Sequence, residues 1–343
     1  MISLKRMLPE SARRWVKETN PLSRIYHDRR RITPHPAFMY IEVTTRCNLS
    51  CRTCCREGLL PDEIKDMEFE CFREIVDQAS SFPGIAFHLS GVGEVLLYPR
   101  FAEAVSYIRQ RFPHAPIVAN TNGRLVHGDI ADLLLTLDSV LIRVSAGSRE
   151  GYSLLAGADG YEELTSNVEA FLTSRRELSL SRDNGKPFVS LQLWETDRTA
   201  EEESAFRKHW EPLLGDNGQV EVKRRTLCGG PVSTAALHAR IDKAESGYPC
   251  LYLWRSLAVG VDGEIYPCCE AFRRRRQSSL RLGNVHHQGL DAAYHSPVLR
   301  QARALHLAHQ YHKVADCAEC EIHATHRNIW WRLPTPVFGR KWL

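Results

Sequence analysis

Short apolar segments alternate with longer segments of helical period between residue 37 and about residue 225. Six of the apolar segments have the length and composition of buried strands, and they cover residues 38–45, 85–90, 115–121, 139–145, 188–194 and 219–224. Between them, apolar side chains recur at steps of three and four, in residues 67–80, 101–112, 127–136, 161–175 and 200–214. Strands that alternate with helices predict a parallel sheet with crossover helices. We therefore expect an α/β fold whose core is a partial (β/α)6 TIM-like barrel.

A group of cysteines directly follows the first expected strand. Four of the 11 cysteines lie in the segment RCNLSCRTCC, where Cys47, Cys51 and Cys54 have the spacing C-x3-C-x2-C. Loops at the carboxyl ends of the strands carry the active sites of TIM-like barrels. Structural zinc usually takes four ligands, whereas closely spaced thiolates on one loop are typical of iron–sulfur clusters. Three thiolates on a four-iron cluster would leave one iron open for a further ligand; zinc or ordinary core cysteines are the alternatives.

Several segments resemble the motifs of the radical S-adenosylmethionine (radical SAM) superfamily. The approach to the cysteine loop is IEVTTRCNLSC, and SGVGEVLLYP (90–99), ANTNG (119–123) and IRVSAGS (142–148) follow in the family's order. The resemblance implies that the three cysteines of the C-x3-C-x2-C loop hold a [4Fe-4S] cluster whose open iron binds SAM. It also implies that SAM is cleaved reductively to a 5′-deoxyadenosyl radical, which abstracts hydrogen from a substrate.

The same resemblance assigns residues to the SAM site. Gly91 and Gly93 would let the backbone approach the ligand closely, and Glu94 would accept a hydrogen bond from the SAM ammonium group. Asn122 belongs to the matching third-strand segment, and Ser145 would contact the ribose or the carboxylate of SAM. All five lie at or just after the ends of expected strands.

Strand alternation adds Arg143 to this group without help from the family. If Ser145 points into the barrel, Arg143 two residues earlier points there too. A buried arginine needs an anionic partner, for which the SAM carboxylate, an acidic group of the substrate and a structural salt bridge are all open. The same rule turns four further polar side chains toward the inside of the barrel: Glu42, Thr44, His88 and Ser90.

The rear part of the chain carries a second set of cysteines. VGVDGEIYPC reads as a hairpin with its turn at Asp262-Gly263. Around it, the cysteine spacing and the later C-x2-C pair resemble the SPASM/twitch extension of radical SAM enzymes. That resemblance implies one auxiliary [4Fe-4S] cluster, with zinc as the alternative, and its ligands would be Cys250, Cys268, Cys317 and Cys320.

These features divide the chain into four predicted regions. They are a basic N-terminal extension (1–36), a radical SAM partial barrel (37–225), a SPASM/twitch auxiliary cluster domain (226–325) and a basic aromatic tail (326–343). No stretch is apolar enough to span a membrane, and the N-terminus lacks the features of a secretory signal. We expect a cytoplasmic protein, and its net charge of +4 does not indicate a nucleic-acid partner.

Further cysteines and a run of arginines lie outside these ligand sets. Cys228 follows the sixth strand without an evident partner, so it is a candidate hydrogen donor to a substrate radical or a linker cysteine. Cys55, Cys71 and Cys269 are expected to be packed core thiols. The run at 273–276 is four arginines, which would be either a solvated loop or a site for a phosphate or carboxylate.

The leading functional hypothesis is hydrogen abstraction from a small polar substrate, resembling a carbohydrate or an aminocyclitol, that ends in oxidation or epimerisation. The auxiliary cluster would then exchange an electron with the substrate, and a low-potential donor such as flavodoxin or ferredoxin would reduce the first cluster. The alternatives are a SPASM-type maturase that modifies a ribosomal peptide and a non-catalytic, metal-stabilised binding protein.

Overall fold

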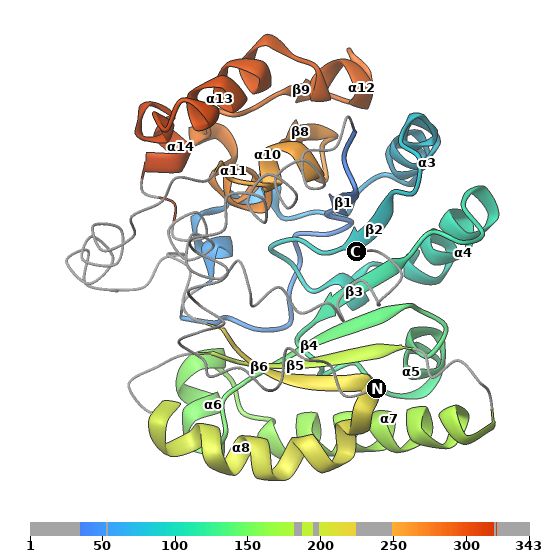
Figure 1. Ribbon diagram of the computed structural model, residues 1–343. Helices are drawn as coiled ribbons and strands as arrows, with labels where there is room; N and C mark the ends of the chain where they lie inside the picture. Colours follow the sequence, from blue (N-terminus) through green and yellow to red (C-terminus); the bar gives the residue numbers. More distant parts are fainter. Residues whose placement is uncertain are drawn as a thin grey trace, which may run out of the picture.

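The computed structural model describes residues 35–52, 54–181, 187–194, 199–223, 249–318 and 320. Its centre is one sheet of nine strands in the order β6-β5-β4-β3-β2-β1-β7-β8-β9 (Figure 1). The strands are β1 (Phe38–Ile41), β2 (Ala86–Leu89), β3 (Ile117–Thr121), β4 (Ser139–Ser145), β5 (Phe188–Trp194), β6 (Gly218–Lys223), β7 (Ser256–Val259), β8 (Glu264–Tyr266) and β9 (Gly283–Asn284).

Strands β1 to β6 are all parallel, and each pairs with its neighbours in the sequence. The helices that connect or follow the strands are α3 (Phe69–Gln78), α4 (Phe101–Arg111), α5 (Gly128–Leu134), α6 (Arg149–Ala156), α7 (Tyr161–Ser181), α8 (Thr199–Leu214), α10 (Tyr252–Arg255), α11 (Cys269–Arg274), α12 (Gly289–Tyr294), α13 (Pro297–Leu307) and α14 (Ala315–Ala318). Among the described strands nothing pairs β6 with β9, so the sheet stays open. The predicted α/β fold with a partial barrel is confirmed.

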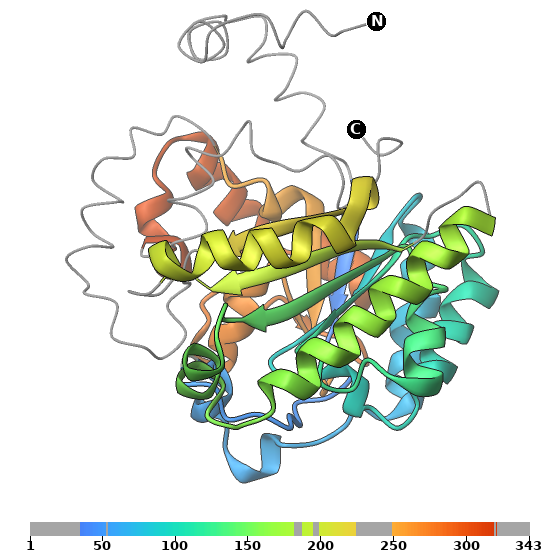
Figure 2. The same cartoon turned by 90° about the horizontal axis from the view of Figure 1, so that it is seen from below.

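Five helices cover the outer, convex face of the first six strands: α3, α4, α5, α7 and α8 (Figures 1 and 2). On β4, Val140, Ile142 and Val144 are fully buried beneath this layer. Arg143 between them is exposed, and Leu141 is half-buried. We call the concave inner side of the sheet the lumen. Because alternate side chains of a strand point to opposite faces, the polar residues of β4 line the lumen.

The helical stripes form for the expected reason. In α3, Phe69, Phe72, Ile75 and Val76 recur at helical spacing, and all four are buried in the core. The predicted helices match the observed ones to within a few residues, except at the end of α7, which runs on to Ser181. The eight-residue helix α6 is absent from the prediction, although Ser148 caps its first turn and Gly157 ends it with a left-handed φ of 65°.

The hairpin with its turn at Asp262-Gly263 forms as predicted, from β7 and β8. Gly263 has a φ of 77°, which favours glycine at this turn. The hairpin is not a separate sheet, because β7 pairs in parallel with β1 along its whole length. The rear part of the chain therefore continues the barrel sheet on the far side of β1.

Some predicted features lie outside the described residues. Cys228, most of the N-terminal extension (1–36) and the tail (326–343) belong to them. The boundary between the two predicted domains at residue 226 also falls there. Within the described part of the chain, no helix has both the length and the apolar composition needed to cross a membrane.

Candidate active site

The front cysteine loop, residues 47–55, leaves β1 at the carboxyl edge of the sheet and packs against the end of α6. The backbone amide of Ser50 donates to the carbonyl of Ala156 at 3.3 Å, and that of Arg52 donates to Leu155 at 3.0 Å. At Gly157, a Cβ atom would lie 2.5 Å from the carbonyl oxygen of Ser50. The loop that carries the predicted ligands is thus held by backbone contacts that leave no room for a side chain at residue 157.

The three predicted front ligands lie in surroundings that disfavour free thiolates. Burial is the main factor that raises the pKa of Cys47 and of Cys51. The pKa of Cys54 is raised first by a hydrogen bond with Cys55 and then by burial. Thiolates at these positions therefore need a cationic partner to stabilise them, and metal ions supply such a charge.

Glu94 and Asn122 meet beside the cysteine loop. The Glu94 side chain is buried, and its carboxylate accepts from the backbone amides of Asn122 at 2.6 Å and Leu96 at 3.2 Å. The Asn122 amide nitrogen donates to Oδ1 of Asn48 at 2.6 Å and lies 3.9 Å from the Cys47 sulfur. The structure thus brings together Cys47, Glu94 and Asn122, three predicted site residues from the segments that follow β1, β2 and β3. The Glu94 carboxylate already accepts hydrogen bonds from the backbone of the protein itself.

Gly91 and Gly93 are tightly enclosed by the protein itself. A Cβ at Gly93 would lie 2.4 Å from the carbonyl oxygen of Thr44, and one at Gly91 would lie 2.4 Å from Cγ of Glu42. The amide of Glu94 donates to the carbonyl of Arg46 at 2.8 Å. The contacts that exclude a side chain here are therefore with the segment between β1 and the cysteine loop. A role in close approach to SAM remains a prediction.

Arg143 and Ser145 stand at the carboxyl end of β4. The Arg143 side chain is exposed to solvent, as expected for a residue that lines an open lumen. Partial desolvation by the surrounding barrel residues lowers the pKa of Arg143, and the nearby charge of Arg273 lowers it further. The guanidinium carbon lies 5.1 Å from the ring centre of Trp194. No ion pair of Arg143 is found among the described residues, so its predicted anionic partner is not a protein carboxylate there.

Ser145 has a strained backbone. Its φ is 74°, and the pairing of β4 with β5 shifts register between Arg143 and Ser145. A non-glycine residue in this region is uncommon, and such residues are often found at functional sites. Glu202 of α8 holds the segment that follows, because its carboxylate accepts from the amide of Gly147 at 3.0 Å and from the hydroxyl of Ser148 at 2.7 Å. Sequence analysis missed Glu202, which no local pattern marks.

The rear cysteines converge from three segments of the chain. Cys250 influences the pKa of both Cys268 and Cys317, and Cys320 influences that of Cys268. Burial raises the pKa of Cys250 to about 11 and that of Cys269 to about 12. All four predicted rear ligands are therefore electrostatic neighbours, with Cys269 as a fifth thiol beside them. Cys71 is buried on α3, as expected of a core thiol.

The donor sets fit iron–sulfur clusters. No group of three Cys, His, Asp or Glu side chains in the described part of the chain is arranged to hold a single metal ion. A four-iron cluster does not need such convergence, since each iron takes its own thiolate. Cys47, Cys51 and Cys54 would hold the front cluster, and Cys250, Cys268, Cys317 and Cys320 the rear one. The first would supply the electron for SAM cleavage when bound.

The arginine run does not form a free anion site in the described structure. Arg273 pairs with Glu270 at 2.9 Å, Arg275 with Glu42 at 2.8 Å, and Arg276 with Glu63 at 2.8 Å. Two of these partners come from the barrel. The run is not a loop, because Arg273 and Arg274 are the last residues of α11 and the next two residues lie in a 3-10 turn, but Arg276 is exposed to solvent as expected.

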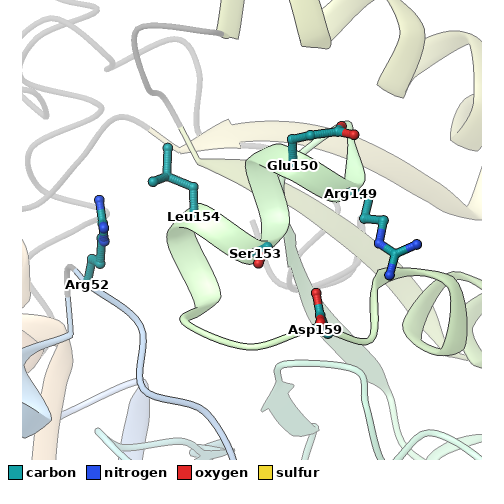
Figure 3. A pocket seen from close by; sticks show the side chains of 6 residues that line it. All are labelled: Arg52, Arg149, Glu150, Ser153, Leu154 and Asp159. Atoms are coloured by element: carbon teal, nitrogen blue, oxygen red, sulfur yellow. The ribbon is translucent and has the colours of Figure 1, made fainter.

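A pocket of about 520 Å³ lies between Arg52 of the cysteine loop and helix α6 (Figure 3). Arg149, Glu150, Ser153, Leu154 and Asp159 complete its lining. Its walls include none of the predicted ligands or SAM-site residues. We therefore place the candidate active site in the lumen rather than in this pocket.

Two family models match the parts of the chain that carry the two predicted donor sets. Residues 41–178 match the model of the radical SAM superfamily, and residues 250–321 match that of the SPASM iron–sulfur cluster-binding domain. Among solved structures, SuiB of Streptococcus suis bound to S-adenosylmethionine is 13% identical with a TM-score of 0.60, over 89% of this chain and 75% of that one. BtrN in complex with AdoMet and 2-DOIA is 16% identical with a TM-score of 0.52, over 83% and 92%. At these identities the likeness concerns the fold.

Two of the relatives that match in sequence illustrate the range of coverage. AlbA, a subtilosin biosynthesis protein of Bacillus subtilis, is 21% identical over 300 residues, which are 78% of this chain and 61% of AlbA. The cofactor-modifying protein of tungsten-containing aldehyde ferredoxin oxidoreductase from Pyrococcus furiosus is 32% identical over 32% of this chain and 30% of its own length. The matches thus span less than two thirds of either relative. With the cysteine loop, the rear thiols and both family models in agreement, the chain belongs to the radical SAM superfamily and carries a SPASM domain.

Proposed function

We propose that this chain oxidises a substrate held in the lumen, by removing first a hydrogen atom and then an electron, with a proton released from the substrate to solvent. The radical SAM chemistry would supply the 5′-deoxyadenosyl radical that takes the hydrogen atom. The remaining electron would pass to the rear cluster, whose potential lies anywhere within the wide range of protein iron–sulfur clusters. Cleavage of SAM would require a low-potential donor such as flavodoxin or ferredoxin.

One observation carries this proposal: the front and rear cysteines flank the same lumen. Cys51 and Cys54 lie close enough to Arg143 to influence its pKa, and Cys268 and Cys269 do the same for Tyr40. Arg143 and Tyr40 both belong to the lumen side of their strands. A substrate between them would have a radical source on one side and an electron acceptor on the other.

The residues of the chain would divide the work of binding and orientation. Asn122 would hold the front loop through Asn48, and Glu94 would fix the backbone at residue 122. Arg143, which lacks a carboxylate partner in the described structure, would bind the carboxylate of SAM or an acidic group of the substrate. Further polar side chains line the lumen on β5 and β6, where Glu221 accepts from Ser190 and Gln192 at 3.4 Å.

For the substrate class, a peptide has the stronger support. AlbA is named for the biosynthesis of a bacteriocin, and its match covers 78% of this chain. A structure of SuiB is described with a precursor peptide, SuiA. The open sheet would admit an extended chain. We therefore rank modification of a ribosomal peptide above the small polar substrate that sequence analysis favoured.

A second candidate is oxidation of a small polar molecule. The polar side chains that line the lumen on β4, β5 and β6, among them Arg143, Gln192 and Glu221, favour a small polar substrate. Its hydroxyl, amide and charged groups would find hydrogen-bond partners there. Epimerisation would instead need a hydrogen donor, and its candidate, Cys228, lies outside the described residues.

The test is label transfer in the anaerobically reconstituted full chain, reduced with dithionite and supplied with SAM. We expect 5′-deoxyadenosine to form and to gain deuterium from a deuterated substrate. Perdeuterated short peptides encoded beside the gene would be compared with deuterated polyols and aminocyclitols. Transfer from a peptide supports the first candidate, and transfer from a polyol supports the second. Absence of 5′-deoxyadenosine with the clusters intact would contradict the proposed chemistry as a whole.

A further inference from the structure

A buried ion pair joins the first barrel strand region to the rear part of the chain. Nη2 of Arg275 donates to Oε1 of Glu42 at 2.9 Å and to Oε2 at 2.8 Å. The two residues are 233 positions apart in the sequence. The Glu42 side chain is 0% exposed and that of Arg275 is 14% exposed. Such a pair is shielded from solvent, so each charge is stabilised mainly by its partner and little by hydration.

The same carboxylate holds the glycine segment, residues 90–94, that the family resemblance assigns to SAM. Oε1 of Glu42 accepts from the backbone amide of Val92 at 2.9 Å. Gly91 lies against the Glu42 side chain so closely that a Cβ would be 2.4 Å from its Cγ. Glu42 therefore fixes the start of this segment, while Glu94 fixes its end through the amides of Leu96 and Asn122.

On the rear side, Arg275 directly follows helix α11. Cys268 caps the start of that helix, and its sulfur accepts from the amide of Ala271 at 3.4 Å. Arg275 itself has a left-handed φ of 46°, an uncommon conformation for a side chain of this size. Surrounding contacts must maintain such a conformation, and the two hydrogen bonds to Glu42 are contacts of that kind. One short path thus leads from a predicted rear ligand to the glycine segment.

The ion pair of Glu42 with Arg275 has two explanations, attachment of the rear part of the chain and positioning of the glycine segment. Attachment alone would be the role that the exposed pair of Arg276 with Glu63 also has. Buried ion pairs, however, often add little net stability compared with apolar residues of similar size. The shared oxygen distinguishes the pair of Glu42, since the atom that binds Arg275 also binds Val92.

We propose that Glu42 and Arg275 are positioning residues through which the rear part of the chain sets the glycine segment for SAM. This inference rests on the proposed SAM site. Without Arg275, the Glu42 carboxylate would be buried and unpaired, so it would turn away or draw in water. The amide of Val92 would lose its fixed acceptor, and the segment would bind SAM less well.

The test measures SAM binding directly, by equilibrium dialysis of radiolabelled SAM with the anaerobically reconstituted full chain. We expect Arg275→Met to raise the SAM Kd at least tenfold and Arg275→Lys, which keeps the charge, to restore part of the affinity. Arg276→Met removes the exposed pair between the same parts of the chain and should leave the Kd within twofold. A second readout is the electron paramagnetic resonance (EPR) spectrum of the reduced front cluster, which we expect to change less on addition of SAM in Arg275→Met.

A double variant covers the case in which Arg275→Met does not fold. Glu42→Met with Arg275→Met removes both charges together, so it avoids an unpaired buried carboxylate but still lacks the acceptor for Val92. We expect it to fold and to bind SAM at least fivefold more weakly than wild type. Wild-type affinity in a folded Arg275→Met or in the double variant would overturn the inference. Failure of the wild-type chain itself to bind SAM would instead overturn the proposed function.

Discussion

The front and rear cysteine sets are built in opposite ways. The three front ligands lie within eight consecutive positions, 47–54, of one loop, whereas the rear ligands come from residues 250, 268, 317 and 320. The front loop is held by backbone hydrogen bonds to α6, whereas the rear set combines the segment before α10, the N-cap of α11 and the α14 region. We infer that the front donor set is complete within one loop, while the rear donor set requires distant segments of the chain to come together first.

The largest effect should come from removing the front ligands. Cys47→Ala, Cys51→Ala and Cys54→Ala together should abolish SAM cleavage and lower bound iron by about four atoms per chain, the content of one cubane. Iron analysis and chromatography of 5′-deoxyadenosine provide the measurement. Cys55→Ala is the matched control and should keep both, because Cys54 has the spacing of the ligand. Loss of the iron in Cys55→Ala alone would show that the adjacent thiol is the ligand.

Removing rear ligands should separate the two sites. Cys250→Ala with Cys268→Ala should lower iron by a similar amount, yet leave SAM cleavage within about tenfold of wild type, because the front loop keeps its own backbone supports. Formation of the oxidised product should stop. Cys71→Ala, which removes a buried thiol away from both sets, serves as the control. Equal loss of SAM cleavage in the front and rear variants would remove the distinction between the sites.

A smaller effect should come from the contact between α6 and the front loop. Gly157→Ala adds a methyl group 2.5 Å from the Ser50 carbonyl oxygen at a φ of 65°. We expect a loss of about 1–3 kcal/mol in the free energy of unfolding, measured with urea on the metal-free chain. Gly128→Ala is the control, since its φ is 54° and nothing lies within 4 Å of the added atom. Equal losses in both would assign the effect to backbone strain alone.

The smallest effect concerns His88 on β2, whose ring centre lies 5.1 Å from that of Tyr40 near the rear cysteines. Burial lowers the pKa of His88 to about 4, below its ordinary value of about 6.5. Unfolding exposes the ring, so the unfolded chain binds the proton more readily between these pH values. Stability should fall by about 2 kcal/mol from pH 7 to pH 5. His88→Gln should remove most of this dependence, and His114→Gln, at an exposed position, should not; an unchanged profile in His88→Gln would contradict the assignment.

The contrast between the front and rear cysteine sets also explains which features could be predicted from the sequence. The front site is readable because its ligands, and the glycine segment, each lie within a few residues. The six strands were predictable for the same reason, since their apolar runs are continuous. The α6 helix was missed although Ser148 and Gly157 signalled its ends, because eight residues give too short a periodic pattern.

Features that join distant segments could not be predicted in this way. No pattern within the sequence links Glu42 to Arg275. The pairing of β7 with β1 likewise depends on where the rear part of the chain joins the open sheet. Arg143 is intermediate. Alternation correctly turned it toward the lumen, but the solvent around it and the influence of Arg273 became evident only from the assembled barrel. Local order is therefore predictable here, and contacts between the front and rear parts are not.

The central claim is that the front loop holds a cluster with an iron open to SAM, while the rear thiols hold one that is closed. The most direct measurement is EPR of the reduced, reconstituted chain before and after addition of SAM, in wild type and in the variant lacking the rear ligands Cys250 and Cys268. The account predicts that the front signal shifts with SAM in both proteins. A signal that is indifferent to SAM in wild type, or that persists when Cys47, Cys51 and Cys54 are all alanine, would contradict it.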